Sequence, residues 1–207
     1  MRVAVIGASG RTGTEFSRLA LAAGHQVVAI VRDPARLTVK PTAVAIADAQ
    51  SAAELAEALR GVDAVVTCTG PGPDAAHGIV SEAAAAMIEA MSATGLKRVV
   101  MVSAAGPYTE GDNVLMKFVL KPIVQRIFRD GFADLKSAEM LLKASTTDWT
   151  VLRPPRLTDA AGKGRYRSRL DLGIPWGISI SRADLALALL EAITDDNSIH
   201  KTISVAN

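Results

Sequence analysis

The chain has 207 residues, of which 49% are hydrophobic, 21% charged and 4% aromatic, and this suits one large domain over residues 1–207. The net charge of +2 is too small to indicate nucleic acid, and no apolar run approaches the roughly 18 residues that span a membrane. The single cysteine, Cys68, excludes an intramolecular disulfide, so we expect a cytoplasmic protein with no membrane and no nucleic-acid partner.

Short runs rich in valine, isoleucine and alanine recur along the chain and end at Gly, Asp or Pro, as buried parallel strands do. We predict strands at Val3–Ile6, Gln26–Val31, Ala43–Ile46, Ala64–Thr67, Arg98–Val102, Thr150–Leu152 and Thr202–Val205. Stretches of helical spacing separate most of these runs. The alternation predicts an α/β fold with a mostly parallel, doubly wound sheet of about seven strands and helices on both faces.

Three element ends are marked by particular residues. Asp33 precedes Pro34 and is interpreted as the cap of a short helix, and Gly95 is placed to stop the helix that contains Met87. The run Ser181-Arg182-Ala183-Asp184 is similar to a capping box, with Asp in place of Glu, and predicts the start of the last helix.

Two segments, 106–131 and 154–180, interrupt the alternation, and both follow late strands. Because ligands bind at the carboxyl ends of such strands, we expect these segments to form the substrate side of a pocket. The basic amphipathic stretch 114–129 is interpreted as a pocket-covering or dimer-forming helix. The segment 154–180 is predicted to be irregular, with a solvated cationic hairpin, or a surface attracting an acidic acceptor, around Tyr166.

The sequence Gly7-Ala8-Ser9-Gly10-Arg11-Thr12-Gly13 follows the first strand and opens a helix. Gly7 permits a tight turn, Gly10 lets the backbone approach a pyrophosphate, and Gly13 allows close packing of helix on strand. The helix start offers unpaired N–H groups to phosphate. We therefore predict a Rossmann-type dinucleotide-binding loop made of Gly7, Ser9, Gly10, Arg11, Thr12 and Gly13.

Arg32 follows Gly13 by 19 residues (32 − 13), at the end of the second strand. An acidic residue at this point binds both ribose hydroxyls of NAD, whereas an arginine favours the 2′-phosphate of NADP(H). Arg36, one turn further on, is predicted to join it. The sequence therefore predicts NADP(H) as the cofactor.

The chain resembles the atypical short-chain dehydrogenase/reductases, in particular the NmrA-like NAD(P)-binding proteins and the biliverdin-IXβ reductase/flavin reductase group. The resemblance rests on GASGRTG at 7–13, VRDPARL at 31–37, TG at 69–70, VSAAG at 102–106, LKSAE at 135–139, DWTVLRPPR at 148–156 and SRADLA at 181–186. It implies that Asp48 and Ala49 lie against the adenine, with Thr69 and Gly70 near the central phosphates. The other interpretation of Asp48 is a helix cap, a role that Ser51 fits as well.

Conventional short-chain reductases use Ser, Tyr and Lys, with the Tyr four residues before the Lys. This chain keeps Ser103 and Lys136 but has Phe132 at the Tyr position, and a phenyl ring cannot donate a proton. The resemblance implies that Ser103, Lys136 and Pro154 contact the cofactor, that Ser103, Lys136 and Arg156 are catalytic, and that the acceptor pocket contains Tyr108, Phe132, Pro155 and Arg156. Other candidate proton donors are Tyr108, His77 and Tyr166.

These features predict an NADPH-dependent oxidoreductase that passes hydride to a small-molecule acceptor: a flavin, a quinone or another conjugated compound. The alternative is a non-catalytic NADP(H)-binding sensor of the NmrA type. A nucleotide-sugar epimerase is disfavoured because the chain is short and lacks the Tyr. We expect no metal site, since three scattered His and one Cys offer no ligand spacing, and a monomer or homodimer.

Overall fold

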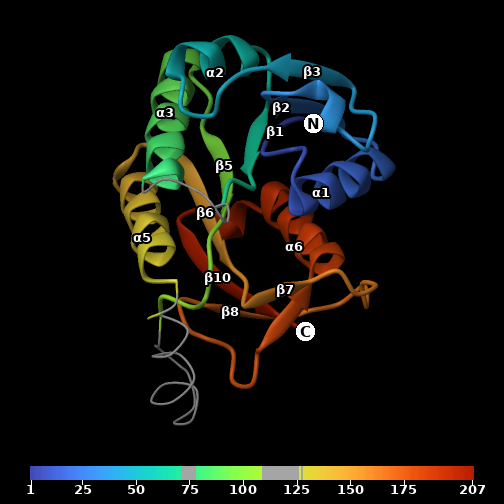
Figure 1. Ribbon diagram of the computed structural model, residues 1–207, viewed down its shortest axis with the longest axis vertical. Helices are drawn as coiled ribbons and strands as arrows, with labels where there is room; N and C mark the ends of the chain where they lie inside the picture. Colours follow the sequence, from blue (N-terminus) through green and yellow to red (C-terminus); the bar gives the residue numbers. More distant parts are fainter. Residues whose placement is uncertain (71–77, 109–125, 127) are drawn as a thin grey trace.

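The computed structural model describes residues 1–70, 78–108, 126 and 128–207. A sheet of eight strands runs through the molecule in the order β3-β2-β1-β4-β5-β6-β10-β8 (Figure 1). The strands are β1 (Arg2–Ile6), β2 (Gln26–Val31), β3 (Ala43–Ile46), β4 (Ala64–Thr67), β5 (Arg98–Val102), β6 (Asp148–Arg153), β10 (Lys201–Ala206) and β8 (Arg167–Leu170). The seven predicted strands are all present and pair in parallel. The doubly wound Rossmann-type fold is therefore confirmed.

The expectation that 154–180 is irregular is wrong in three places. β8 is an antiparallel edge strand on β10, and a separate parallel pair is formed by β7 (Arg156–Thr158) and β9 (Ser179–Ser181). β7 and β9 have three residues each, too few to show an alternating pattern. β8 pairs with the C-terminal strand and not within a local hairpin.

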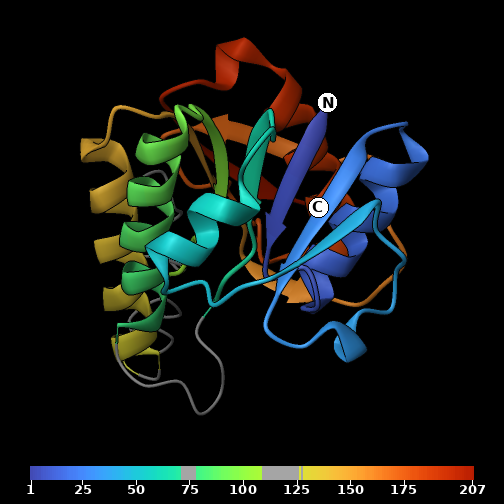
Figure 2. The ribbon, with the colours of Figure 1, turned by 90° about the horizontal axis from the view of Figure 1, so that it is seen from above.

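Helices cover both faces of the sheet. α1 (Arg11–Ala22) lies on one face, and α2 (Ala52–Ala58), α3 (Ile79–Thr94) and α5 (Arg129–Ala144) lie on the other (Figure 2). α6 (Arg182–Thr194) packs against α1. Each face has its own buried core: Phe16 and Leu185 belong to one, and Met87 and Leu142 to the other. Two short 3₁₀ turns, η1 (Pro34–Arg36) and η3 (Asp196–Ser198), complete the described elements.

The predicted caps are confirmed. Asp33 accepts the N–H of Ala35 at 3.0 Å, and Gly95 ends α3 with φ of 73°. Ser181 caps α6, with its Oγ accepting the Asp184 N–H at 3.0 Å and donating to Asp184 Oδ2 at 2.7 Å. The box is not reciprocal, because the Ser181 N–H donates to Asn207 Oδ1. Ser51, not Asp48, caps α2, because its hydroxyl accepts the N–H of Glu54.

The topological switch point lies between β1 and β4. The chain builds β1, β2 and β3 outward to one edge and then returns to β4 on the other side of β1. A doubly wound sheet leaves a crevice at the carboxyl ends of the strands beside such a reversal. The predicted helix within 114–129 and the candidate donor His77 lie largely or wholly outside the described residues. Within the described ranges, no helix is long and apolar enough to cross a membrane.

Candidate functional site

The glycine loop has the close packing that its sequence predicts. Gly7 adopts φ of +81°, and a Cβ on Gly13 would lie 2.3 Å from the Gly7 carbonyl oxygen. Gly10 N–H donates to the same carbonyl at 3.0 Å, and α1 begins at the next residue. No side chain of the described residues caps the start of α1, and its first turn contains no acidic residue. This arrangement leaves the helix start open to a phosphate group.

A groove of about 700 Å³ begins at this loop and runs past the ends of β1, β2, β3 and β4. It brings together predicted cofactor residues from four separate parts of the sequence, namely Gly7, Ser9, Gly10, Arg32, Arg36, Asp48, Ala49, Thr69 and Gly70. The sequence prediction omitted other lining residues, among them Gln50, Ile79 and Ala83. Gly13 is instead buried between α1 and β1, where its lack of a side chain is required.

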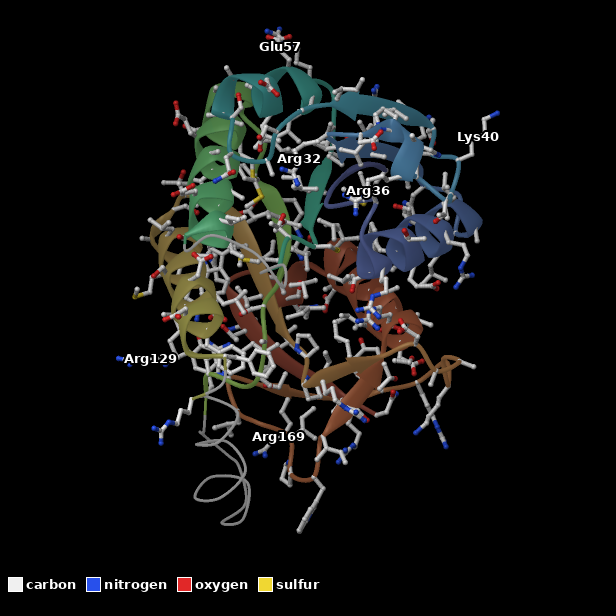
Figure 3. The ribbon with its side chains drawn as sticks, in the orientation of Figure 1. Arg32, Arg36, Lys40, Glu57, Arg129 and Arg169 are labelled. Carbon is white, nitrogen blue, oxygen red and sulfur yellow. The ribbon has the colours of Figure 1, made fainter. Side chains whose placement is uncertain are left out.

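Arg32 and Arg36 supply the positive charge of the groove. Both line it, both are exposed, and they lie near each other beyond the end of β2 (Figure 3). Lys40, four residues further along the chain, lies well away from them at the periphery (Figure 3). Two guanidinium groups at one end of a groove that starts at a phosphate-binding loop fit the 2′-phosphate of an adenine dinucleotide.

The acidic groups of the groove are occupied by local backbone bonds. Asp33 caps η1, and Asp48 accepts the N–H of Gln50 at 3.0 Å. Cys68 also lines the groove, and burial raises the pKa of its thiol to about 12, so the thiol stays neutral. Cys68 is therefore a packing residue of this groove and not a nucleophile.

Arg11 is directed away from Arg32 and Arg36. Its guanidinium forms a salt bridge with Asp159 at 2.9 Å, and Asp159 forms a second salt bridge with Arg182 at 2.6 Å. Arg11 lines a neighbouring cavity of about 460 Å³ between α1 and the start of α6, which shares Ser9 with the cofactor groove. Contact between Arg11 or Thr12 and a cofactor stays a prediction.

Ser103 lies at the end of β5 as predicted, but its hydroxyl has a buried partner. Ser103 Oγ donates to Glu139 Oε1 of α5 at 2.6 Å, and Arg153, at the end of β6, binds both oxygens of the same carboxylate at 3.1 and 2.6 Å. Burial alone would raise the pKa of Glu139, but the bonds from Arg153 and Ser103 outweigh it and lower the pKa. Because its only hydroxyl hydrogen is used in the bond to Glu139, Ser103 can accept a further hydrogen bond but not donate one.

Tyr108 closes this cluster from the segment after β5. The Arg153 guanidinium carbon lies 3.2 Å from the centroid of its ring, and Lys136 Nζ lies 5.4 Å from the same centroid. Burial raises the pKa of Tyr108 to about 12, with a further contribution from Glu139 and an opposing one from Arg153. The phenol is therefore protonated at neutral pH.

Phe132 supports the segment that carries Tyr108. A Cβ on Gly106 would lie 2.4 Å from Phe132 Cζ, so the tip of the ring points at the Gly106 backbone. The ring also packs against the core between α3 and α5, and Phe132 is half-buried. That the ring forms a wall of the acceptor pocket stays a prediction.

The remaining predicted residues surround the cluster at the ends of β5 and β6. Pro154 is buried, and its carbonyl accepts the N–H of Ala105 at 2.8 Å. Pro155 is half-buried, and Arg156 and Lys136 are exposed. These residues belong to different strands and helices from Arg32 and Arg36, and their contact with an acceptor stays a prediction.

Sequence reasoning missed Glu139 and Arg153, although both lie within the motifs that it used. Arg153 ends an apolar strand, and a charge at such a position requires a buried partner. Glu139 is seven residues after Phe132 and three after Lys136, so these side chains share one face of α5. The spacing in the sequence places Glu139 on the same helix face as Lys136. It identifies Glu139 as the partner of Arg153 only once it is known which face of α5 is directed at the end of β6.

The fold and the groove together define a nucleotide-cofactor-binding protein of the Rossmann type. Residues 7–196 match the family described as NAD(P)H-binding, and the chain belongs to that family. It is 29% identical over 199 residues to the uncharacterized Bacillus subtilis protein YwnB, covering 93% of this chain and 92% of YwnB. The resemblance stated from the sequence is confirmed at the level of family.

Solved structures agree in fold over the whole of this chain. An anaerobilin reductase of Escherichia coli O157:H7, ChuY, superposes with a TM-score of 0.80 at 23% identity and is covered to 97%. A short-chain dehydrogenase/reductase of Veillonella parvula in complex with NADP superposes with a TM-score of 0.78 at 18% identity and is covered to 94%. At these identities the likeness shows a shared fold.

Proposed function

We propose that this chain is an NADPH-dependent reductase that passes hydride to a conjugated small-molecule acceptor, with flavins and quinones as the first candidates. The observation that carries the proposal is one groove that joins an uncapped phosphate loop to two arginines, Arg32 and Arg36. The loop provides N–H groups for the pyrophosphate, and the arginines provide charge for a 2′-phosphate.

The acceptor side lies at the ends of β5 and β6. When bound, the cofactor supplies the hydride. The chain's own contribution is to hold Ser103, Arg153 and Glu139 in one buried network and to place Tyr108 and Lys136 beside it. The sequence departure at Phe132 favours an acceptor that is already electron-poor, because α5 offers no phenol at that position.

The sensor function is the second candidate, and a specific observation favours it. The Ser103 hydroxyl donates its hydrogen bond to the carboxylate of a buried ion pair, and Phe132 has no hydroxyl. Neither of these two positions of the conventional catalytic set therefore presents a hydrogen-bond donor to an acceptor. In a sensor this network would have a purely structural role.

Stopped-flow oxidation of NADPH against flavins, quinones and tetrapyrroles separates the two functions. A reductase oxidises many equivalents of NADPH per chain with at least one acceptor, above the rate of the same mixture without protein. A sensor binds NADPH and NADP⁺ with different affinities and oxidises no more NADPH than the blank. Tight NADPH binding without turnover across the panel contradicts the reductase proposal.

A further inference from the structure

We propose that the loop between β8 and β9 is a peripheral membrane-docking surface, which places Trp176 and its apolar neighbours in the headgroup region of a bilayer that contains anionic lipids. This inference goes beyond the proposed reductase function and does not depend on it. The expectation of no membrane partner rested on the absence of a membrane-spanning run, and a peripheral contact requires no such run.

Apolar side chains gather on this loop. Of the exposed large hydrophobic residues in the described part of the chain, four lie within residues 170–178, and their exposed fractions range from 41% to 65%: Leu172, Leu170, Ile178 and Trp176. Figure 1 shows the loop at the lower edge of the molecule, below β8. Single exposed apolar side chains are ordinary, but several together on one loop indicate an interaction surface.

The loop is held in a defined conformation by two arginines of β8 and by packing on β10. Arg167 donates to the Pro175 carbonyl at 3.0 Å, and Arg169 donates to a second loop carbonyl at 2.8 Å. A Cβ on Gly177 would lie 2.8 Å from the Cβ of Ala206, so the loop backbone lies directly against the end of β10. The apolar side chains are therefore presented to solvent by a well-packed loop.

Trp176 has a backbone conformation that few bulky residues adopt. Its φ is 58°, in the left-handed region. Such a conformation costs free energy, persists only where the surrounding structure imposes it, and is concentrated at functional sites. Because the Trp176 side chain is mostly exposed, burial of its indole in the core does not account for this conformation. A role of the indole outside the folded chain does account for it.

Cations flank the loop. Asn207 Nδ2 donates to the Arg165 carbonyl at 3.2 Å and Asn207 N–H donates to the Ser179 carbonyl at 3.0 Å, so Arg165 lies close to the start of β9. Residues 163–178 contain four cations and one acid, namely Lys163, Arg165, Arg167 and Arg169 against Asp171. This excess of positive charge attracts anionic headgroups and opposes the approach of a second copy of the same surface.

The charges of this segment are directed to solvent. Tyr166 packs against the core on the α1 and α6 side, and its hydroxyl donates to Glu191 of α6. Arg165 and Arg167, on either side of it in the sequence, are exposed. The two arginines therefore offer their charge to a partner, while the phenol is turned toward the protein.

A bilayer surface fits these features better than a protein partner does. A stable protein interface buries about 800 Å² on each side and uses about 20–30 residues. This short loop offers far less, and none of its exposed apolar side chains lines either of the two cavities described above. A tryptophan at headgroup level, aliphatic side chains beside it and cations near the lipid phosphates are instead sufficient for a peripheral membrane contact.

Tryptophan fluorescence tests the contact directly. The chain has two tryptophans, and Trp149 is half-buried with its ring 5.6 Å from that of His200, whereas Trp176 is exposed. Vesicles of phosphatidylcholine and phosphatidylglycerol in equal amounts should move the emission of wild type to shorter wavelength, and brominated lipids in these vesicles should quench it. In Trp176→Phe, which retains Trp149 alone, the vesicles should change neither the wavelength nor the intensity.

Vesicle flotation measures the affinity. Trp176→Ala should weaken binding to the anionic vesicles by about ten-fold or more, because the inserted apolar area is lost. Arg165→Gln should weaken it by about five-fold, the usual effect of one cation near an anionic membrane surface. Lys40→Gln, which removes a charge at the far end of the molecule from Arg169, should bind as wild type does (Figure 3).

Three results would overturn the proposal. The first is wild type that neither floats with the anionic vesicles nor changes its emission. The second is equal binding to vesicles of phosphatidylcholine alone, which would remove the role of the cations. The third is a dimer in sedimentation velocity that Trp176→Ala abolishes, since the loop would then be an interface between two copies. NADPH binding and turnover, measured without vesicles, test the reductase function separately.

Discussion

At the scale of single residues, a buried ion pair between Glu139 and Arg153 lies at the centre of the cluster at the ends of β5 and β6. Their side chains are 2% and 11% exposed, and the pair joins α5 to the end of β6. Removing one member of a buried pair leaves the other charge without compensation. The pair therefore fixes the geometry of Ser103 and Tyr108 while remaining out of contact with solvent.

Glu139→Gln should lower the free energy of unfolding by about 3–5 kcal/mol, because Arg153 then lacks its buried counterion. Urea unfolding at neutral pH measures this. Glu57→Gln is the matched control, since its ion pair with Arg60 is exposed, and it should leave the midpoint unchanged. A midpoint for Glu139→Gln equal to that of wild type would mean that the pair contributes nothing net.

The same variant tests the sign of the pH dependence. The pKa of Glu139 is lowered by its partners, so its stabilising contribution is complete above the ordinary carboxylate pKa of about 4.3 and is lost as the pH falls through the lower folded value. Glu139→Gln removes this contribution. Its stability should therefore fall less steeply on acidification than that of wild type.

Residue patterns predicted the cofactor side better than the acceptor side. Gly7, Gly10, Gly13 and Arg32 belong to one strand-loop-helix-strand unit, where sequence spacing and spatial spacing are closely linked. Ser103, Tyr108 and Glu139 come from separate elements, and their meeting depends on the sheet order and on the face of α5. A helix position alone therefore identified Phe132 as lacking a hydroxyl but gave no sign that Tyr108 lies beside Lys136.

At the scale of elements, α3 and α5 are joined by a cap that crosses between them. The two carboxylate oxygens of Asp134, on α5, accept the N–H groups of Val80 and Ser81 in the first turn of α3 at 2.8 and 2.9 Å. Gly78, which precedes α3 with φ of +90°, makes no side-chain cap of its own. Since Ile79 and Ala83 line the cofactor groove, this cap positions one wall of the groove from the acceptor side.

Asp134→Ala should lower the free energy of unfolding by about 1–2 kcal/mol, the usual cost of losing an N-cap. Urea unfolding is again the measurement. Glu89→Ala, which removes a carboxylate from the exposed middle of α3, is the control and should cost much less. Equal losses for the two variants would contradict the capping role.

Short edge elements were the least predictable part of the fold. β8 is exposed along most of its length. Its strand pairing is with β10, whose residues lie more than thirty positions later in the sequence. The alternation of Arg167 and Arg169 suits one face of a strand, but nothing in it identifies β10 as the partner. The central strands, buried on both faces, were predictable because their burial requires unbroken apolar runs.

At the scale of the whole molecule, the sheet separates two tasks. β1 to β3, on one side of the switch point, and β4, directly across it, form the groove that contains Arg32 and Arg36. β5 and β6, on the other side, hold the Ser103, Tyr108 and Arg153 cluster. A dinucleotide lying across the carboxyl ends would connect the two, which is the usual use of this fold.

Calorimetric titration of NADPH and NADH measures the central claim, cofactor selectivity through Arg32. Wild type should bind NADPH at least about ten-fold more tightly than NADH. Arg32→Ala should lose roughly 1.5–3 kcal/mol of NADPH binding, about 10- to 150-fold, and keep its NADH affinity. Lys40→Ala, which removes the same charge away from the groove, should bind both as wild type does. Equal wild-type affinity for the two cofactors, or equal weakening of both by Arg32→Ala, would contradict the account.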